Sequence, residues 1–326
     1  MKLPHRRQFL HLAAGVAALP AVSRVAWAQS YPSRPITMIV PSAPGASIDT
    51  IGRILAERMR RSLAQPIIIE NIGGADGSIG AGRAARAKPD GYTIDLGYLG
   101  NHVLNGAVYS LQYDVLNDFA PISPLVTFPD FLYVRRTIPA NDLNELIAWL
   151  KANPNRASMG VTAVGPRLIN EWFRTETGTR YTVVPYRGTG PAQDLASGQI
   201  DLYFGTPDLL SLARAGSIKV HAVTSETRLA VAPEVPTFAE LGMPKISWFA
   251  WFGLFAPKGT PKEVVTQLNA AAVEALADLA VRSRLIDLGF EIFPREQQTP
   301  EVLGTLVKAD AERTWPIIKA ANIRRE

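Results

Sequence analysis

Short hydrophobic runs alternate with amphipathic stretches along the chain from residue 35 onward. The hydrophobic runs are rich in β-branched and aromatic residues, as expected of buried strands. They predict strands at residues 36–40, 66–70, 92–99, 157–162, 181–186, 200–204, 218–224 and 248–256. The amphipathic stretches predict a helix N-capped by Asp49, a small-residue helix ending at Ala87, and helices at residues 142–152, 166–175, 191–197, 261–288 and 300–320. This alternation is typical of α/β proteins in which helices flank mostly parallel sheets.

The order of these elements predicts two lobes. A long extended segment, residues 119–134, follows the third strand and is expected to carry the chain out of the first lobe. The aromatic strand at residues 248–256 is placed to bring it back, and two long helices then close the chain. We therefore expect lobe one to comprise residues 30–124 plus 250–326, and lobe two to comprise residues 125–249. A length of 326 residues suits two such units.

The first 28 residues have the composition of an export signal. Basic residues precede an apolar run at residues 9–22, and an Ala-Trp-Ala motif at residues 26–28 fits a cleavage site before Gln29. Arg6 and Arg7 fit the core of a twin-arginine signal, so twin-arginine export and ordinary secretion both stay open. The apolar run is shorter than the roughly 20 residues that span a bilayer. We therefore expect the mature protein in the periplasm.

Most of the positive net charge lies in this leader. The whole chain carries a formal charge of +5 with a pI near 9.4, which would suit a nucleic-acid-binding protein. Four basic residues and no acidic ones lie in residues 1–28, so the remainder carries about +1. We therefore expect no nucleic-acid partner. The chain also has no cysteine, which excludes disulfides, thiolate metal sites and cysteine nucleophiles.

The residues of the mature chain offer little catalytic chemistry. Only His102 and His221 remain after the leader, and the chain has no H-E-x-x-H or G-x-S-x-G motif. The glycine-rich residues 73–82 match neither the dinucleotide-binding pattern nor the P-loop pattern. We therefore expect no catalytic residue, no metal site and no cofactor. His221 lies in a strand pattern and is expected to be structural, whereas His102 follows a strand end and is a candidate for ligand contact.

Four loops are candidates for anion binding. They follow predicted strands and open predicted helices at residues 41–49, 73–78, 164–167 and 187–191. Such a loop presents backbone N–H groups at the positive end of the helix dipole, where an anion binds favourably. Because two of the loops belong to each lobe, we expect them to meet at one cleft and to hold a carboxylate-sized ligand from both sides.

Several motifs resemble those of the extracytoplasmic solute receptors of tripartite tricarboxylate transporters, the Bug-type periplasmic binding proteins. The strings V-P-S-A-P-G-A-S-I-D at residues 40–49 and E-N-I-G-G-A-D-G-S-I-G at residues 70–80 look like two ligand loops of that family. Further matches are P-D-G-Y-T at 89–93, D-F-A-P-I at 118–122, V-P-Y-R-G at 184–188, G-Q-I-D at 198–201, P-E-V-P-T at 233–237, E-L-G at 240–242 and A-P-K-G-T-P at 256–261. In this order they cover nearly the whole mature chain.

The resemblance implies both a fold and a function. Members of the family have the two-lobed periplasmic-binding-protein fold, also called a Venus flytrap, with the ligand cleft between the lobes. The resemblance therefore implies a monomeric receptor that captures a small carboxylate without catalysis and delivers it to the membrane permease subunits of a tripartite transporter. Two alternatives stay open. One is a ligand-sensing receptor for a signalling kinase, and the other is a secreted hydrolase or isomerase on the same fold.

The candidate site residues come from the strand-end loops and from the resemblance. They are Ser42, Ala43, Ala46, Ser47, Gly74, Ala75, Asp76, Leu99, Gly100, Asn101, His102, Thr162, Gly165, Arg167, Arg187, Gly188 and Asp208. Asp76 stands where the family commonly has glycine, and it adds a negative charge beside the expected carboxylate pocket. Arg167 is expected in the first turn of its helix, with Pro166 as the first helical residue. Arg167 either anchors a ligand carboxylate from lobe two or pairs with Glu171.

Overall fold

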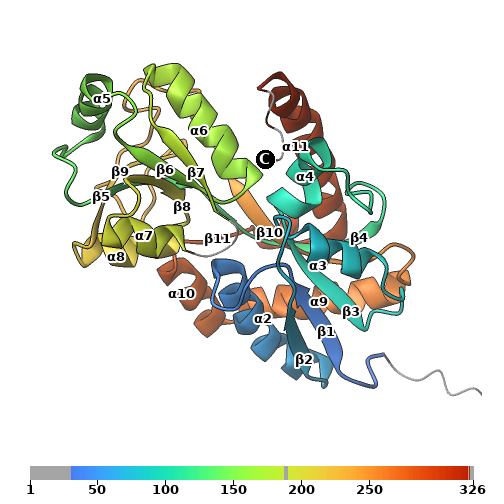
Figure 1. The fold of residues 1–326 in the computed structure, drawn as a ribbon. Helices are drawn as coiled ribbons and strands as arrows, with labels where there is room; N and C mark the ends of the chain where they lie inside the picture. Colours follow the sequence, from blue (N-terminus) through green and yellow to red (C-terminus); the bar gives the residue numbers. More distant parts are fainter. Residues whose placement is uncertain (1–30, 187–189, 322, 324–326) are drawn as a thin grey trace, which may run out of the picture. The chain divides into compact units, whose positions relative to one another are not determined.

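The computed structural model describes residues 31–186, 190–321 and 323, and every structural statement below refers to these residues. The predicted leader and the cleavage site before Gln29 lie outside them. Residues Pro32–Glu326 group into one compact unit. Within this unit two β-sheets are each flanked by helices, and we call each sheet with its helices a lobe (Figure 1).

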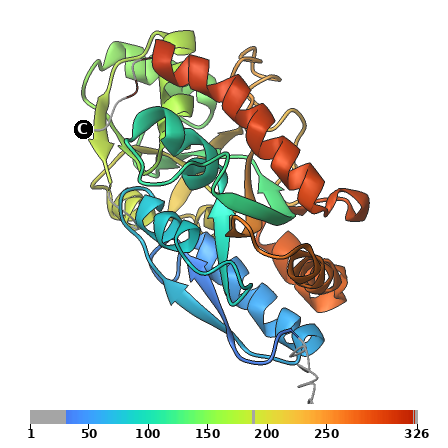
Figure 2. The same ribbon diagram turned by 90° about the vertical axis from the view of Figure 1, so that its right-hand side faces the viewer.

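Lobe one is built on a six-stranded sheet in the order β11-β4-β10-β3-β1-β2. Its strands are β1 (Ile36–Val40), β2 (Ile67–Asn71), β3 (Thr93–Tyr98), β4 (Phe119–Phe128), β10 (Ala250–Pro257) and β11 (Glu291–Ile292). Its helical segments are α2 (Ser47–Leu63), α3 (Ser78–Ala85), the π-helical turn η1 (Gly100–Leu104), α4 (Asn105–Val108), α9 (Lys262–Ala277), α10 (Leu279–Asp287), η3 (Arg295–Gln297) and α11 (Pro300–Ala320). Figures 1 and 2 both show α2 next to α9, outside this sheet.

Lobe two is built on a five-stranded sheet in the order β7-β6-β8-β5-β9. Its strands are β5 (Phe131–Arg135), β6 (Ser158–Val161), β7 (Thr182–Pro185), β8 (Leu202–Gly205) and β9 (Ile218–Val223). Its helical segments are α5 (Leu143–Ala152), α6 (Val164–Thr177), α7 (Pro191–Ser197), the short 3-10 helix η2 (Pro207–Leu209) and α8 (Leu210–Arg214). All the predicted strands are therefore present, with ends that differ by a few residues.

The two-lobed α/β class is confirmed, but both sheets are mixed rather than mostly parallel. Strand β1 is parallel to β2 and β3, and β6 is parallel to β7 and β8. Strand β10 is antiparallel to β3 and β4, and β5 is antiparallel to β8 and β9. The physical reason is clearest for β4 and β10. One carries the chain out of lobe one and the other brings it back, so as neighbours they run in opposite directions.

The chain crosses between the sheets at Pro129 and Asp130. Strand β4 continues to Phe128 in the first sheet, beyond the expected boundary at residue 124, and β5 begins the second sheet at Phe131. The segment that leaves lobe one is linked by hydrogen bonds to the segment that returns to it. The backbone N–H of Asp130 donates to Oγ1 of Thr224 at 2.9 Å, and that hydroxyl donates to the carbonyl of Trp248 at 2.9 Å. We therefore propose residues 129–130, rather than 124, as the first lobe boundary.

The helix expected at residues 261–288 is broken at Asp278. Its side chain accepts hydrogen bonds from the backbone N–H groups of Ala280 at 3.0 Å and Val281 at 3.3 Å, so it caps α10. Apolar periodicity runs through both helices, and the capping aspartate is the signal of the break. Among the described residues no single helix is long and apolar enough to cross a membrane; α9 and α10 pass that test only as a pair bent by 71°.

The start of α2 also differs from the prediction. The helix begins at Ser47, so Asp49 is its third residue and not its N-cap. The Asp49 carboxylate is buried and accepts hydrogen bonds from the backbone N–H of Gly45, from Arg53 and from Asn71. These bonds hold the pKa of Asp49 below its usual range despite burial, which acts the other way. Asp49 therefore fixes the loop that precedes the helix.

Candidate functional site

Loops from both lobes meet at the carboxyl ends of the strands. Ser47, at the start of α2, donates from its hydroxyl to Oδ1 of Asp208 in lobe two at 3.0 Å. The same hydroxyl lies 3.3 Å from Oγ1 of Thr206, the residue after β8. In the loop after β2, Asp76 accepts a hydrogen bond from the backbone N–H of Val164, the first residue of α6, at 3.2 Å. The loops at residues 41–49, 73–78 and 164–167 therefore face one another.

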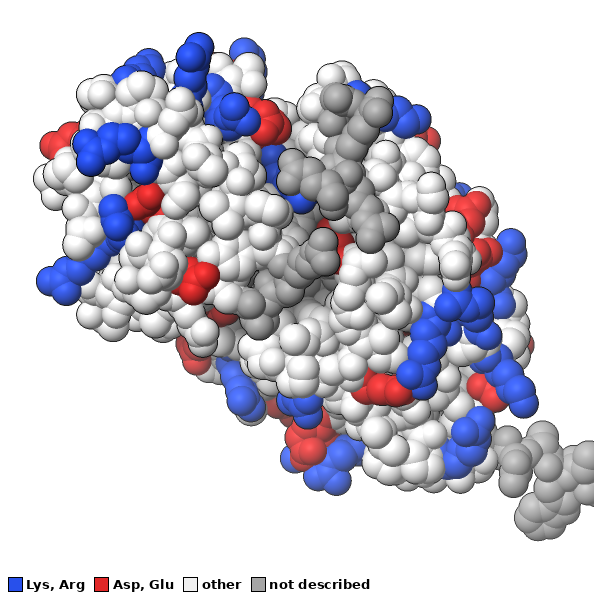
Figure 3. Space-filling view, in the orientation of Figure 1, with Lys and Arg blue, Asp and Glu red and all other residues white. Residues whose placement is uncertain are grey.

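The surface at this junction agrees with the charge balance of the mature chain. Figure 3 shows a hollow where the lobes meet. On the face drawn there, Lys and Arg side chains are interspersed with Asp and Glu side chains rather than gathered in one basic patch. Arg187 and Gly188, which belong to the fourth expected loop, lie outside the described residues.

Three helices begin at this junction without a cap from their own side chains. Their N-cap residues are Ala46 for α2, Gly77 for α3 and Ala163 for α6, and none makes a side-chain capping bond. Helices α7 and α9 also begin without such a bond, whereas α5, α10 and α11 are capped by Asp142, Asp278 and Thr299. The first N–H groups of a helix have no partner inside it, and the helix dipole makes this end attractive to anions. The junction therefore offers anion-binding positions from both lobes.

Asp76 is the charged side chain of lobe one at this junction. It lies in the left-handed region of backbone conformation, with φ of 52°, which aspartate tolerates better than most residues. The Tyr98 hydroxyl donates to its carboxylate at 3.0 Å and to its carbonyl at 2.8 Å. Burial raises the pKa of Asp76, while the bonds from Val164 and Tyr98 and the positive charge of Arg167 act in the opposite direction. The carboxylate is thus desolvated but hydrogen-bonded.

Arg167 acts on this carboxylate. Helix α6 begins at Val164, two residues earlier than expected, so Pro166 is its third residue and Arg167 its fourth. The backbone N–H of Arg167 donates to the carbonyl of Ala163 at 3.1 Å, within the helix. Glu171 bonds to Arg174 at 3.2 Å. The positive charge of Arg167 acts to lower the pKa of Asp76, and a ligand carboxylate beside Arg167 stays a prediction.

The lobe-two side of the junction also contains residues outside the candidate set, Thr206 and Asp130 among them. The Tyr133 hydroxyl donates to the carbonyl of Thr206 at 3.0 Å. A hydrogen bond between Tyr203 and Thr162 acts to lower the pKa of Tyr203, but burial and the charges of Asp130 and Asp208 raise it overall. Thr206 directly follows a predicted strand, so the strand-end rule applied there could have found it. Asp130 gave no such signal, because it lies within a segment predicted to be extended throughout.

His102 is buried in lobe one, and the structure gives no support to its candidacy for direct ligand contact. It is fully buried in lobe one, where its ring stacks on Phe255 at 4.0 Å between centroids. Its Nδ1 lies 3.0 Å from Oδ1 of Asn101, and its Nε2 lies 3.3 Å from the carboxyl of Asp95. Burial lowers the pKa of His102 to about 3 and raises that of Asp95 well above its usual value. The imidazole is therefore neutral, and it belongs to the core.

The three residues that precede His102 are also buried. Leu99 precedes the π-helical turn η1, and Gly100 and Asn101 begin it, so the side chains of Leu99 and Asn101 are buried in lobe one and no open loop follows the strand. The Asn101 side chain accepts a hydrogen bond from the backbone N–H of Tyr98 at 2.9 Å. Strand-end position alone did not reveal this turn, so these expected contacts through side chains are not supported.

Most of the remaining candidates are exposed or half-buried loop residues, and one, Gly165, is a buried packing position. Ala43, Gly74 and Ala75 are exposed, and Ser42, Ala46 and Thr162 are half-buried. Gly165 is buried, and a Cβ placed there would lie 3.2 Å from the ring of Trp248. Gly165 therefore allows α6 to pack closely against the segment that returns to lobe one. Among the described residues, no three His, Asp or Glu side chains group as metal ligands would.

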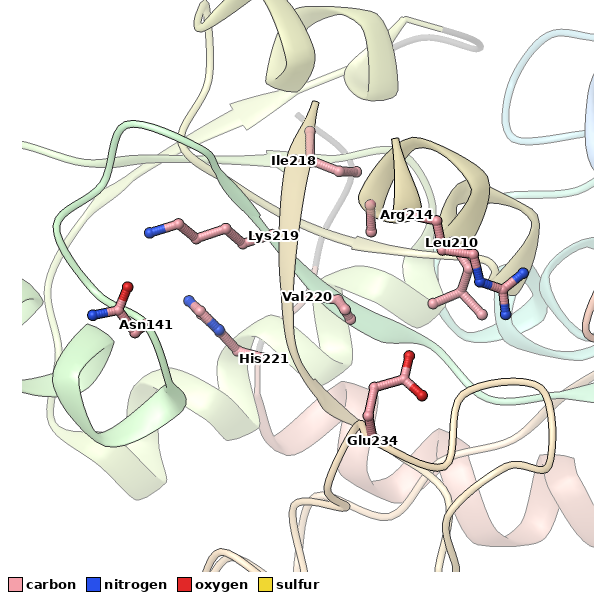
Figure 4. Close-up of a pocket in the computed structure, with 9 residues that line it drawn as sticks. Asn141, Leu210, Arg214, Ile218, Lys219, Val220, His221 and Glu234 are labelled. Carbon is pink, nitrogen blue, oxygen red and sulfur yellow. The ribbon is translucent and has the colours of Figure 1, made fainter. Parts of the chain in front are cut away.

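A separate cavity of about 390 Å³ lies on lobe two around the edge strand β9. Figure 4 shows Lys219 and His221 on one side of this strand, and Arg214 and Glu234 on the other. The ammonium group of Lys219 donates to two backbone carbonyls, at 2.9 and 2.7 Å, and Arg214 donates to the carbonyl of Val231. These cations stabilise local backbone. A second cavity, of about 470 Å³, lies between α3 and the segment after α4 in lobe one.

The fold and the junction define a two-lobed solute-binding protein of the periplasmic class. Comparison with known families agrees: residues 51–323 match the tripartite tricarboxylate transporter family receptor. The chain belongs to this family, which is a family of binding proteins. The expectation drawn from the sequence motifs is thereby confirmed.

Individual relatives are similar over most of their length. Protein BugT of Bordetella pertussis is 37% identical over 260 residues, which cover 78% of this chain and 80% of the relative. The structure of the periplasmic binding protein BugD is 33% identical, with a TM-score of 0.85, and covers 90% of this chain and 100% of BugD. MatC from Rhodopseudomonas palustris, solved with bound malate, is 36% identical with a TM-score of 0.82, and covers 87% of this chain and 98% of MatC.

Proposed function

We propose that this receptor captures a small organic acid between its lobes and delivers it to the permease subunits of a tripartite tricarboxylate transporter. The observation that carries the proposal is the meeting of three helix N-termini at the junction of the lobes, those of α2, α3 and α6, whose own N-cap residues make no side-chain capping bond. Helix N-termini of this kind bind carboxylates and other anions. The bound malate of MatC supports the same ligand class.

The first carboxylate of the ligand is assigned to lobe one. Residues 74–77 all have positive φ, from 47° to 101°, so the backbone of this loop curves tightly ahead of α3. Successive backbone N–H groups in such turns form concave anion sites. Ser47 adds a hydroxyl at the start of α2, next to Asp208 of lobe two. The ligand then contacts both lobes, and it closes them because it binds the closed state more tightly than the open one.

The other parts of the proposal concern export and assembly. We propose that residues 1–28 are removed before Gln29 on export to the periplasm and that the mature receptor is a monomer that performs no catalysis on its ligand. Mass spectrometry of the periplasmic protein tests the cleavage site. Light scattering tests the monomer. Recovery of a candidate acid unchanged after incubation with the receptor tests the absence of catalysis.

A thermal-shift screen over mono-, di- and tricarboxylates, amino acids and aromatic acids tests the binding proposal. A ligand at 100 times its dissociation constant should raise the free energy of unfolding by about 2.7 kcal/mol. A hit is then measured by calorimetry and by small-angle scattering, which should show a smaller radius of gyration with the ligand than without it. If no acid in the screen raises the melting temperature, the carboxylate assignment is wrong.

A further inference from the structure

Asp76 belongs to lobe one but caps a helix of lobe two. The N-cap residue of α6 is Ala163, whose side chain cannot accept a hydrogen bond. Oδ2 of Asp76 accepts the N–H of Val164, the first residue of α6, at 3.2 Å. This is the role that an aspartate N-cap normally performs within its own chain segment. The positive end of α6 is thus occupied by a carboxylate of the protein itself, and α6 contacts η1 of lobe one.

Lobe one holds this carboxylate in place. The hydroxyl of Tyr98 donates to Oδ1 of Asp76 at 3.0 Å, which leaves Oδ2 for α6. The main-chain carbonyl of Asp76 accepts from Tyr98 and from the Asn105 amide, each at 2.8 Å. Asn105 also donates to the Ser78 hydroxyl at 2.8 Å. The side chain is therefore oriented by its own lobe, and closure of the cleft brings α6 to it.

The charges around this position favour one kind of ligand. The positive charge of Arg167, on α6, acts on Asp76. At the other contact between the lobes, the Asp208 carboxylate accepts the hydroxyl of Ser47. Both contacts thus use a carboxylate of the protein. A second carboxylate on a ligand that reached the N-terminus of α6 would approach the negative charge of Asp76 in a half-buried space, where like charges repel.

We propose that Asp76 is a specificity-determining residue: it fills the anion position of lobe two when the lobes meet, and it selects acids that bring no second carboxylate to that end. This inference rests on the proposed function, since it concerns the acid held in the same cleft. MatC, which is 36% identical to this chain, was solved with a dicarboxylate, malate. We therefore expect this receptor to differ from MatC in its preferred ligand.

The test uses matched acids and matched variants. Butyrate is compared with succinate, and hexanoate with adipate, by calorimetry on the wild type and on Asp76→Asn and Asp76→Gly. Both substitutions suit a backbone with positive φ, and the glycine variant leaves Tyr98 its bond to the main-chain carbonyl of residue 76. Asp90→Asn is the control, because it removes one negative charge from a turn at the opposite end of strand β3, where Asp90 pairs with Arg34.

The wild type should bind each monocarboxylate at least tenfold more tightly than its matched dicarboxylate. Both Asp76 variants should reduce this ratio at least tenfold, and Asp90→Asn should leave it unchanged. The inference is overturned if the wild type prefers the dicarboxylates, or if the ratio is the same in the wild type and in the Asp76 variants.

A second measurement needs no ligand, and it separates this inference from the proposed function. The chain has no cysteine, so Lys151→Cys on α5 and Lys308→Cys on α11 give one spin label in each lobe. Without ligand, Asp76→Gly should lengthen or broaden the distance between the labels relative to Asp76, whereas Asp76→Asn should leave it nearly unchanged, because its amide oxygen can still accept the hydrogen bond from Val164. If no acid binds any variant, the proposed function fails, and an unchanged distance in Asp76→Gly then overturns the capping role as well.

Discussion

The buried carboxyl of Asp130 should make the folded protein less stable as the pH rises. Asp130 lies in the crossing between the lobes and is 4% exposed. Burial raises its pKa from 3.8 to about 7. Its charge also raises the pKa values of Tyr133 and Tyr203, which pack nearby. The substitution Asp130→Asn removes the charge and keeps the size of the side chain.

The size of this pH effect on the free energy of unfolding follows from the pKa of Asp130 in the folded protein and in the unfolded chain. Between pH 3.8 and pH about 7 the folded protein holds a proton on Asp130 that the unfolded chain has lost. Because the folded pKa is the higher one, ionisation destabilises the fold, and the loss grows as the pH rises through this window. Each unit of difference corresponds to about 1.4 kcal/mol, so the full effect above neutral pH is at most about 4 kcal/mol. Below pH about 4 the effect is absent, because both states are protonated.

Thermal unfolding of the wild type and Asp130→Asn from pH 4 to pH 8 measures this effect. The variant should be more stable by about 1 to 4 kcal/mol at pH 8, with the difference shrinking toward zero at pH 4. Asp90→Asn, on an exposed turn where the Asp90 side chain is 41% exposed, is the control and should show no such trend. A difference of equal size at pH 4.5 and pH 8 would refute the reasoning, because only a buried titrating group produces the slope.

Three other predictions concern packing, capping and export. Gly97→Ala should destabilise the fold by about 1 to 3 kcal/mol or more, since a Cβ there would lie 2.3 Å from the buried ring of His102; an unchanged melting temperature would contradict this. Asp278→Ala should lower the free energy of unfolding by about 0.5 to 2 kcal/mol through loss of the α10 cap, and Asp278→Asn should restore most of it in the same denaturant titration. Replacing Arg6 and Arg7 by Lys should stop export while the precursor still binds ligand; continued accumulation in the periplasm would show that ordinary secretion is used.

The elements of the fold could be predicted because their signals are local. Strand β10 and helix α11 each have a periodic or continuous apolar pattern, and the structure contains both. The break at Asp278 has a local signal too, but an apolar pattern continues across it on both sides. The pairing of β10 with β3 and β4 has no local signal, since it joins strands more than a hundred residues apart in the chain. The mixed character of the sheet was therefore not predictable from either strand alone.

The candidate site was predictable as a set of loops and not as a set of side chains. The glycine-rich sequence at residues 73–78 predicted a tight turn before a helix. The structure places this loop at the junction of the lobes. The burial of His102 could not be predicted, because it depends on Phe255 and Asp95 from other parts of the chain. Asp76 was recognised as unusual, but its partner Val164 is a backbone N–H, which no sequence pattern marks.

The sequence by itself determined the family, the α/β class, the two lobes and the loops at the strand ends, because periodicity, turn residues and motif spacing are properties of short segments. The tertiary structure alone decided which strands are neighbours, which polar residues are buried, and which groups meet between the lobes. Burial and electrostatic interaction depend on atoms brought together from distant parts of the chain. The capping of α6 by Asp76 is such a case: its donor and acceptor lie 88 residues apart in sequence and 3.2 Å apart in space.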